Sequence, residues 1–254
     1  MEKLQKIGVP ILALVAFGLF WEFIVWVNGW PNYVMASPSD LPAAYIRFWD
    51  LFLIMGWQTL WRTVLGLLIA VVFGTLLGMA MGFSKIARDA LYPLLVGFNA
   101  IPKATLVPVI ALLFIGQHDF NTVLMAFLIS FFPIAVSVGI GLSTLEPEYR
   151  DILRALGASK VTIFWKIALP KTLPEFFGAL KVAVTLAFIG TNLVEIVSPH
   201  GRGLGALFKS GETNANYPLM FAVLIALAVL GIVLYYAVVA LEKIFAGWAE
   251  RPQS

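Results

Sequence analysis

Six long apolar segments alternate with shorter polar ones along the chain. The apolar segments cover residues 7–27, 57–83, 90–115, 120–142, 172–197 and 217–245. A helix of about 20 predominantly apolar residues is long enough to cross the hydrocarbon core of a bilayer. The pattern therefore predicts an all-α, polytopic membrane protein with six transmembrane helices in a single domain, residues 1–254. The polar stretch after the first segment predicts a short interfacial helix that begins at Ser39 or Asp40.

The composition supports a membrane protein. Hydrophobic residues make up 61% of the chain and charged residues 12%, whereas soluble domains average about 45–50% and about 25%. The first apolar segment is interpreted as a retained span, because it contains Trp21 and Trp26 where a signal-peptide cleavage site needs small residues. Since the chain has no cysteine, disulfides, thiolate metal sites and a cysteine nucleophile are excluded.

The basic residues are distributed unequally between the two sides of the predicted bundle. If the amino terminus is cytoplasmic, 11 of the 17 lysines and arginines fall on the cytoplasmic side. The outer side then carries Arg47, Arg62, Arg202 and Lys209, while Lys103 and Lys181 lie within spans. Because cytoplasmic loops carry an excess of basic residues, both termini and segment 143–171 are expected in the cytoplasm.

Small residues recur at every fourth position along the second span. They are Gly66, Ala70, Gly74, Gly78 and Gly82. Helices in lipid associate through close backbone approach, because lipid provides little hydrophobic drive between them. We expect this stripe to face another helix of the same chain, and we favour that interpretation over a contact between subunits.

The third span contains three prolines, Pro93, Pro102 and Pro108. Each proline removes a backbone donor and clashes with the preceding turn, so this helix is expected to be kinked or locally broken. Non-helical backbone at membrane depth is tolerated where protein or a water-filled cavity covers it. This span is therefore expected inside the bundle, along a pathway.

Polar residues within the apolar segments are candidates for lining a substrate path: Glu22, Asn99, Lys103, Thr191, Asn192 and Glu195. Charged groups at membrane depth are costly and usually face a cavity or a partner. With a rise of about 1.5 Å per residue, Lys103 and Glu22 lie at similar depths and could form an ion pair. Alternatively, the Lys103 ammonium caps backbone carbonyls beside the Pro102 break.

Two further groups of polar residues are given structural roles. Lys181 lies near the inner end of its span, where its ammonium is expected to extend to the membrane interface or to pack against segment 143–171. His118 and His200 lie apart in short loops, and without clustered ligands no metal site is expected.

Segment 143–171 interrupts the apolar pattern with two short amphipathic helices. Pro147 suits the start of the first helix, and Gly157 is expected to end it in a left-handed conformation. Ser159 is a favourable N-cap for the second helix, which runs to Pro170. Together they form a compact projection with an apolar side suited to a partner protein.

The same segment resembles a motif of a known family. The pattern Asp151-Ile152-Leu153, three residues, Gly157, nine residues, Ile167-Ala-Leu-Pro170 is similar to the EAA loop of ABC-importer permeases. The segments SPSDLPAAYIRF, IPKATLVPVIALLFIG, LPKTLPEFFGALKVAV, GRGLGAL and LEKIFAGW resemble the nitrate, sulfonate and taurine branch of that family. The usual Glu-Ala-Ala is replaced by Asp-Ile-Leu, which could alter the fit of the first helix to its partner.

The resemblance implies a type I ABC-importer permease whose loop is a coupling helix for a separate ATPase. The implied coupling residues are Asp151, Arg154, Ala155, Leu156, Gly157, Ala158, Ser159, Lys160, Ile167 and Pro170. The chain has no G-x-x-x-x-G-K-[S/T] phosphate loop. ATP and Mg²⁺ are therefore expected on the partner ATPase, with no cofactor in this chain.

The implied assembly crosses the inner (plasma) membrane of a bacterium or archaeon. It would contain two ATPase subunits, a second copy of this chain and a periplasmic or lipid-anchored solute-binding protein, all in contact with membrane lipid and without nucleic acid. The resemblance implies a small anion such as a sulfonate, taurine or nitrate as substrate. A neutral or heterocyclic vitamin precursor is the alternative. A channel or a secondary transporter is a weaker alternative, because neither has a use for a docking loop.

Overall fold

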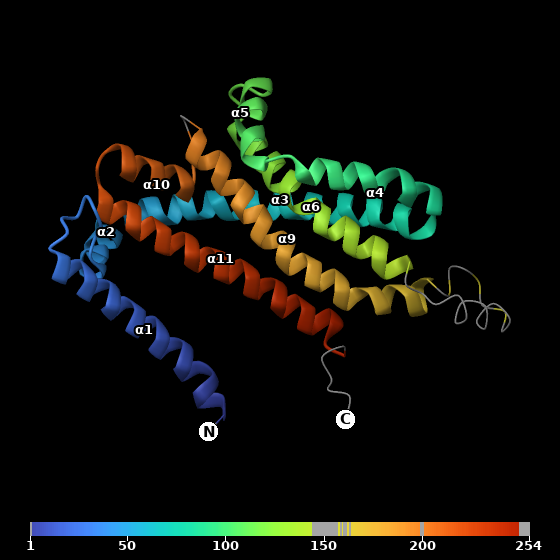
Figure 1. Ribbon diagram of the computed structural model, residues 1–254, viewed down its shortest axis with the longest axis horizontal. Helices are drawn as coiled ribbons and strands as arrows, with labels where there is room; N and C mark the ends of the chain where they lie inside the picture. Colours follow the sequence, from blue (N-terminus) through green and yellow to red (C-terminus); the bar gives the residue numbers. More distant parts are fainter. Residues whose placement is uncertain are drawn as a thin grey trace.

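The computed structural model describes residues 2–143, 157, 159, 162, 164–198 and 201–248, and all the regular structure in these ranges is helical. The helices are α1 (Glu2–Asn28), a 3-10 turn η1 (Pro38–Asp40), α2 (Leu41–Arg47), α3 (Trp49–Phe83), α4 (Lys85–Ala100), α5 (Lys103–Leu113), α6 (His118–Ser143), a π-helical turn η2 (Phe164–Ala168), α9 (Leu169–Val197), α10 (Leu204–Thr213) and α11 (Tyr217–Ala246). Figure 1 shows their arrangement as a bundle of long helices with α1 set apart at one side.

The long helices coincide with the expected spans, but fewer of them meet the requirements for crossing a membrane. Among the described residues, α3, α6, α9 and α11 are long and apolar enough, and the bent pair α4–α5 makes a fifth span if counted as one. In α1 the apolar described stretch, Leu12–Asn28, is too short to qualify. The all-helical membrane fold is therefore confirmed, and four or five of the six expected spans are found among the described residues.

The centre of the bundle is formed by α3, α6 and α9, and the glycines of α3 explain why the first two lie so close. A Cβ placed on Gly66 would lie 2.5 Å from the Cβ of Ala126. One placed on Gly78 would lie 2.7 Å from the carbonyl oxygen of Ala135. The small-residue stripe thus faces α6 of the same chain, which confirms the expected intramolecular helix pair.

The contact between α6 and α9 also depends on glycines, one on each helix. A Cβ on Gly141 of α6 would lie 2.5 Å from Cγ2 of Thr172, and one on Gly190 of α9 would lie 2.8 Å from the carbonyl oxygen of Met125. Buried apolar side chains fill the space between these close approaches, among them Ile134 and Ala187. The three helices therefore pack as one unit.

The third expected span is broken, as its prolines predicted. The axes of α4 and α5 differ in direction by 91°, and the break falls at Ile101 and Pro102. Leu95 of α4 is buried against the bundle, whereas Leu112 and Leu113 of α5 are about seven-tenths exposed. The span lies on the outside of the isolated chain, which differs from the expected position inside the bundle, because one of its faces is left uncovered by the helices that the structure describes.

The predicted interfacial helix is present as η1 and α2. Tyr45 of α2 donates a hydrogen bond of 2.7 Å to the carbonyl oxygen of Ala222 in α11. Burial raises the pKa of Tyr45 above its ordinary value, so this phenol remains a donor at neutral pH. The contact fixes α2 against the start of α11.

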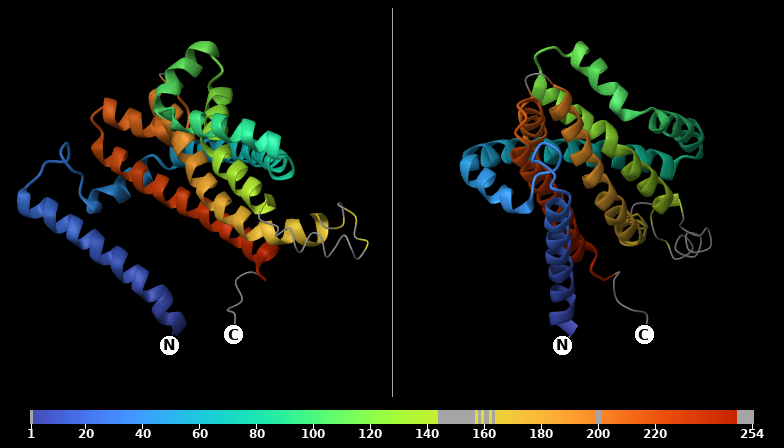
Figure 2. Two further views of the ribbon diagram at one scale, coloured as in Figure 1. Left: turned by 45° about the vertical axis from the view of Figure 1, so that its right-hand side comes forward. Right: turned by 60° about the vertical axis from the view of Figure 1, so that its left-hand side comes forward.

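The two ends of the bundle can be distinguished by the segments that leave them. The end of α6 and the start of α9 lie at one end, close to the end of α11, and the start of α1 lies on the same side (Figures 1 and 2). We call this the coupling end, because residues 144–163 connect α6 to η2 there. The opposite end, with α2 and α10, is called the far end.

Two glycines of α3 give a direct test of the close packing. We expect Gly78→Ala to lower the free energy of unfolding by about 2 kcal/mol, because its Cβ would contact backbone that cannot move independently. Gly56, on the same helix, has no heavy atom within 4 Å of such a Cβ. Gly56→Ala should therefore stabilise α3 by about 0.5–1 kcal/mol. Thermal unfolding of both variants in detergent measures the difference, and shifts of the same sign would contradict the helix pair.

Candidate functional site

We call residues 143–171 the coupling segment. Its described part adopts the turn predicted at Gly157. Gly157 has a φ of +81°, the left-handed conformation expected for the residue that ends a helix. The space beside Gly157 is open, because no heavy atom lies within 4 Å of a Cβ placed on this residue. A side chain at this position would therefore be opposed by backbone strain and not by lack of space.

The start of the second predicted helix also has the expected cap. The hydroxyl oxygen of Ser159 accepts a hydrogen bond of 3.1 Å from the backbone N–H of Thr162, as an N-cap side chain does. The chain then continues through η2 into α9, with Ile167 half-buried and Pro170 in the first turn of α9. Of the coupling residues named from the sequence, Asp151, Arg154, Ala155, Leu156, Ala158 and Lys160 lie outside the described residues.

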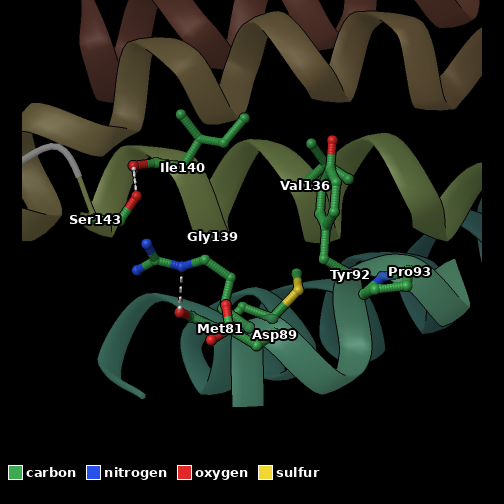
Figure 3. Close-up of a pocket in the computed structure, with 9 residues that line it drawn as sticks. Met81, Asp89, Tyr92, Pro93, Val136, Gly139, Ile140 and Ser143 are labelled. Carbon is green, nitrogen blue, oxygen red and sulfur yellow. Dashed lines mark hydrogen bonds between the residues drawn. The ribbon is translucent and has the colours of Figure 1, made fainter. Parts of the chain in front are cut away.

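A cavity of about 460 Å³ opens at the coupling end between α3, α4 and α6. Its lining residues are Met81, Arg88, Asp89, Tyr92, Pro93, Val136, Gly139, Ile140 and Ser143. The ring of Tyr92 extends from α4 toward Val136 of α6 (Figure 3). The Arg88 Nε donates to the carbonyl oxygen of Met81 at 3.2 Å, which holds the arginine against α3. The lining thus combines an aromatic ring, apolar groups and one charge of each sign.

Lys103 and Glu22 do not pair with each other in this structure. The Lys103 ammonium donates to the carbonyl oxygens of Phe98, Asn99 and Ile101 at 2.7, 3.0 and 3.2 Å. The Glu22 carboxylate accepts from the hydroxyl and the backbone N–H of Ser39, at 2.8 and 3.1 Å. Lys103 therefore has the alternative role considered from the sequence, in which its charge satisfies the backbone at the break between α4 and α5.

Three helices contribute to a buried ion cluster at the far end. Glu195 of α9 and Arg62 of α3 are 0% and 1% exposed, and the Arg62 Nη1 lies 3.3 Å from Glu195 Oε1. The Arg62 Nε donates to Asp119 Oδ1 of α6 at 2.9 Å. Thr59 Oγ1 lies 2.9 Å from Glu195 Oε2. Burial of Glu195 and Arg62 is acceptable here because each charge has hydrogen-bond partners. Asp119 is exposed and contacts the cluster from its surface.

The sequence interpretation missed Arg62 as part of this cluster. It counted Arg62 among the outer basic residues, whereas the structure places it inside α3 and buries it. The available signal was a position within the second apolar segment, a place where an arginine requires an acidic partner. Glu195, which the sequence did single out, supplies that partner.

The other polar candidates on α9 lie close to this cluster. Thr191 is fully buried, and its Oγ1 lies 2.9 Å from the Oγ1 of Thr63. The Asn192 Nδ2 donates to the carbonyl oxygen of Phe188, and Asn192 Oδ1 has no partner among the described groups. The structure therefore brings Thr191 and Glu195 together against α3. None of the described hydrogen bonds or ion pairs joins them to Glu22, Asn99 or Lys103, and their place along a substrate path stays a prediction.

Lys181 has a partner within the bundle. Its ammonium lies 2.9 Å from Glu242 Oε2 of α11, which differs from the expected extension to the interface because an acid lies within reach. His118 Nε2 accepts from the backbone N–H of Arg202 at 3.1 Å. No group of three or more metal-binding side chains occurs in the described ranges, and His200 lies outside them.

Comparison with known proteins gives the family. Residues 70–246 match the family described as "Binding-protein-dependent transport system inner membrane component". The chain belongs to this family. It is 32% identical to the formylaminopyrimidine transport permease protein ThiX of Halalkalibacterium halodurans, over 99% of this chain and 100% of the relative. It is 26% identical to the taurine transport system permease protein TauC of Escherichia coli, over 84% of this chain and 82% of the relative.

A solved structure supports the same fold. A chain of the MetNI methionine ABC transporter, solved in inward-facing conformations, aligns with a TM-score of 0.63 at 20% identity. The alignment covers 78% of this chain and 98% of that chain. The protein is thus a multi-pass membrane permease with the fold of a type I importer. It is a permease subunit and not an enzyme by itself, and it acts with a separate ATPase and a solute-binding protein.

The turn at Gly157 can be tested in the permease. Gly157→Val should reduce ATPase co-purification and ATP-driven uptake about tenfold, because a φ of +81° costs an L-residue about 1–2 kcal/mol. Gly157→Asn is the matched control, since asparagine adopts this conformation more readily. Equal activity of the valine and asparagine variants would show that the left-handed turn is not needed for coupling.

Lys103 offers a second test. Lys103→Met removes the ammonium from three carbonyls and should destabilise the permease by about 1–2 kcal/mol, seen as a lower unfolding temperature in detergent. Lys103→Arg, which keeps a charged donor, should restore most of this loss. Uptake by both variants is measured in proteoliposomes. A methionine variant that unfolds like the unmodified permease but has lost uptake would place Lys103 in the substrate path instead.

Proposed function

We propose that this permease conducts a small neutral heterocycle of the vitamin-precursor kind through an ABC importer. The observation that carries the proposal is the position of the Lys103 ammonium, which is bound by three backbone carbonyls. A lysine within the third span could otherwise attract an anionic solute. Three carbonyl dipoles directed at the ammonium weaken its attraction for an anionic solute.

The cavity at the coupling end supports the same substrate class. Its volume of about 460 Å³ falls in the range of small-molecule sites, about 300–1,000 Å³. Tyr92 offers a ring face for stacking, and Arg88 and Asp89 balance each other in charge. We place this cavity at the inner mouth of the substrate path.

The comparisons also favour a heterocycle. The relative that is 32% identical over nearly the whole chain is named for formylaminopyrimidine, whereas the taurine permease is 26% identical over a smaller share. A small anion such as a sulfonate, taurine or nitrate remains the second candidate, supported by that relative. Substrate selection itself belongs mainly to the solute-binding protein in this proposal.

The proposed assembly contains two copies of the permease, with one ATPase at each coupling segment. The exposed apolar face of α4–α5, with Leu112 and Leu113, supports a second copy, since a broken span requires cover from protein or a water-filled path. ATP and Mg²⁺ would bind to the two ATPases, and the solute-binding protein would deliver substrate at the far end. The excess of basic residues supports a cytoplasmic position for both termini.

The substrate class is tested on the intact complex. The permease is purified in nanodiscs together with the ATPase and the solute-binding protein that accompany it. Calorimetric titration of that binding protein with a formylaminopyrimidine, taurine and nitrate should show binding of the pyrimidine alone. ATP-driven uptake of the labelled pyrimidine into proteoliposomes should follow. Binding and uptake of taurine or nitrate, without the pyrimidine, would overturn the proposed substrate.

A further inference from the structure

The loop before α10 is held by side chains from another part of the chain. The backbone N–H of Leu204 donates to Thr59 Oγ1 at 2.8 Å, and that of Gly205 donates to Glu195 Oε2 at 3.0 Å. The Arg62 Nη1 donates to the carbonyl oxygen of Arg202. We name Thr59, Arg62 and Glu195 the far-end clamp. It satisfies the first two N–H groups of α10, which have no partner within that helix.

The loop itself is shaped to fit the clamp. Gly203 has a φ of +124°, a conformation that L-residues with side chains rarely adopt. A Cβ on Gly205 would lie 2.8 Å from the Cβ of Glu195. The backbone can therefore approach Glu195 only because these two positions are glycine. The position of α10 is thereby tied to the last turns of α9.

The opposite end of α9 begins at the coupling segment. Its 29 residues, Leu169–Val197, span about 43 Å at a rise of about 1.5 Å per residue. The helix follows η2 directly and is packed against α6 at Gly141 and at Gly190. A displacement imposed on the start of α9 is therefore carried to Glu195 by a continuous, closely packed helix.

We propose that the far-end clamp positions α10 on α9, so that ATP-driven motion at the coupling segment reaches the outer surface of the permease through α9. A buried ion pair contributes little stability compared with an apolar pair, whereas removal of one member leaves an uncompensated buried charge. The clamp therefore has few acceptable arrangements. This property suits a contact through which a displacement of α9 must move α10. This inference rests on the proposed assembly with an ATPase at each coupling segment but not on the proposed substrate.

The test uses the absence of cysteine from the chain. Ser210→Cys places one thiol on the exposed side of α10. In the complex with its ATPase in nanodiscs, the rate of labelling by a water-soluble maleimide is measured without nucleotide and after trapping with ADP and vanadate. With the clamp intact, trapping should change the rate by about fivefold or more, the size of a typical coupling. Adding Thr59→Val should abolish this change, and Thr59→Ser, which keeps the hydroxyl, should restore it.

Two further variants complete the test. Glu195→Gln, which keeps the shape of the side chain, should also abolish the change, and it decides the matter if the valine variant fails to assemble. Glu242→Gln is the matched control, because it breaks the ion pair of Lys181 at the coupling end and leaves the clamp intact. The proposal is overturned if trapping changes nothing in the parent, if both clamp variants keep the full change, or if the control loses it equally. Since trapping needs no substrate, these outcomes are independent of the pyrimidine experiment.

Discussion

The close approach of α3 to α6 is the contact on which the remaining structure depends. In lipid, two apolar helices gain little by leaving their surroundings for each other, so their association requires backbone contact and dense packing. The glycines of α3 provide this contact along its length, from Gly66 near Ala126 to Gly82 near Leu142. Because α9 lies against both helices, through Gly190 and Thr191, the same contact determines where α9 can lie. The unit of α3, α6 and α9 is therefore held together by backbone contacts at identified glycines.

The broken span shows how polar groups are satisfied where the helix fails. A proline at position 102 cannot donate to the carbonyl oxygen of Phe98, which accepts instead from the backbone N–H of Ile101 at 3.3 Å. Lys103 supplies a further donor from the next residue, so its ammonium helps to stabilise the break. The consequence for function is that the ammonium of Lys103 is already bound by three backbone carbonyl oxygens. This is why we favour a neutral solute over an anion.

Much of the fold was predictable because the determining signals are local. Apolar length located the spans, the four-residue spacing of small residues identified the face of α3, and proline positions located the break. The turn at Gly157 and the cap at Ser159 were also predictable, since each depends on one residue and its neighbours. The partners of Arg62, Lys103 and Lys181 were not, because each choice depends on which helices lie side by side. The helix α10 was missed because the first N–H group of α10, that of Leu204, is satisfied by Thr59, which lies 145 positions earlier in the chain.

The two ends of α9 make different kinds of contact. This difference is consistent with a helix that carries a displacement from one end of the bundle to the other. At the coupling end, η2 joins α9 to a segment with an exposed turn at Gly157, which leaves room for a partner protein. At the far end, Glu195 is fully buried and bonded to α3 and to the loop before α10. A displacement of the exposed end is carried along α9, which is closely packed against α6 at Gly141 and Gly190, to the buried end, where the loop is bonded to the helix. Separating Arg62 from Glu195 would leave an uncompensated buried charge, which is energetically costly. This cost favours movement of α9 and the loop before α10 as one unit.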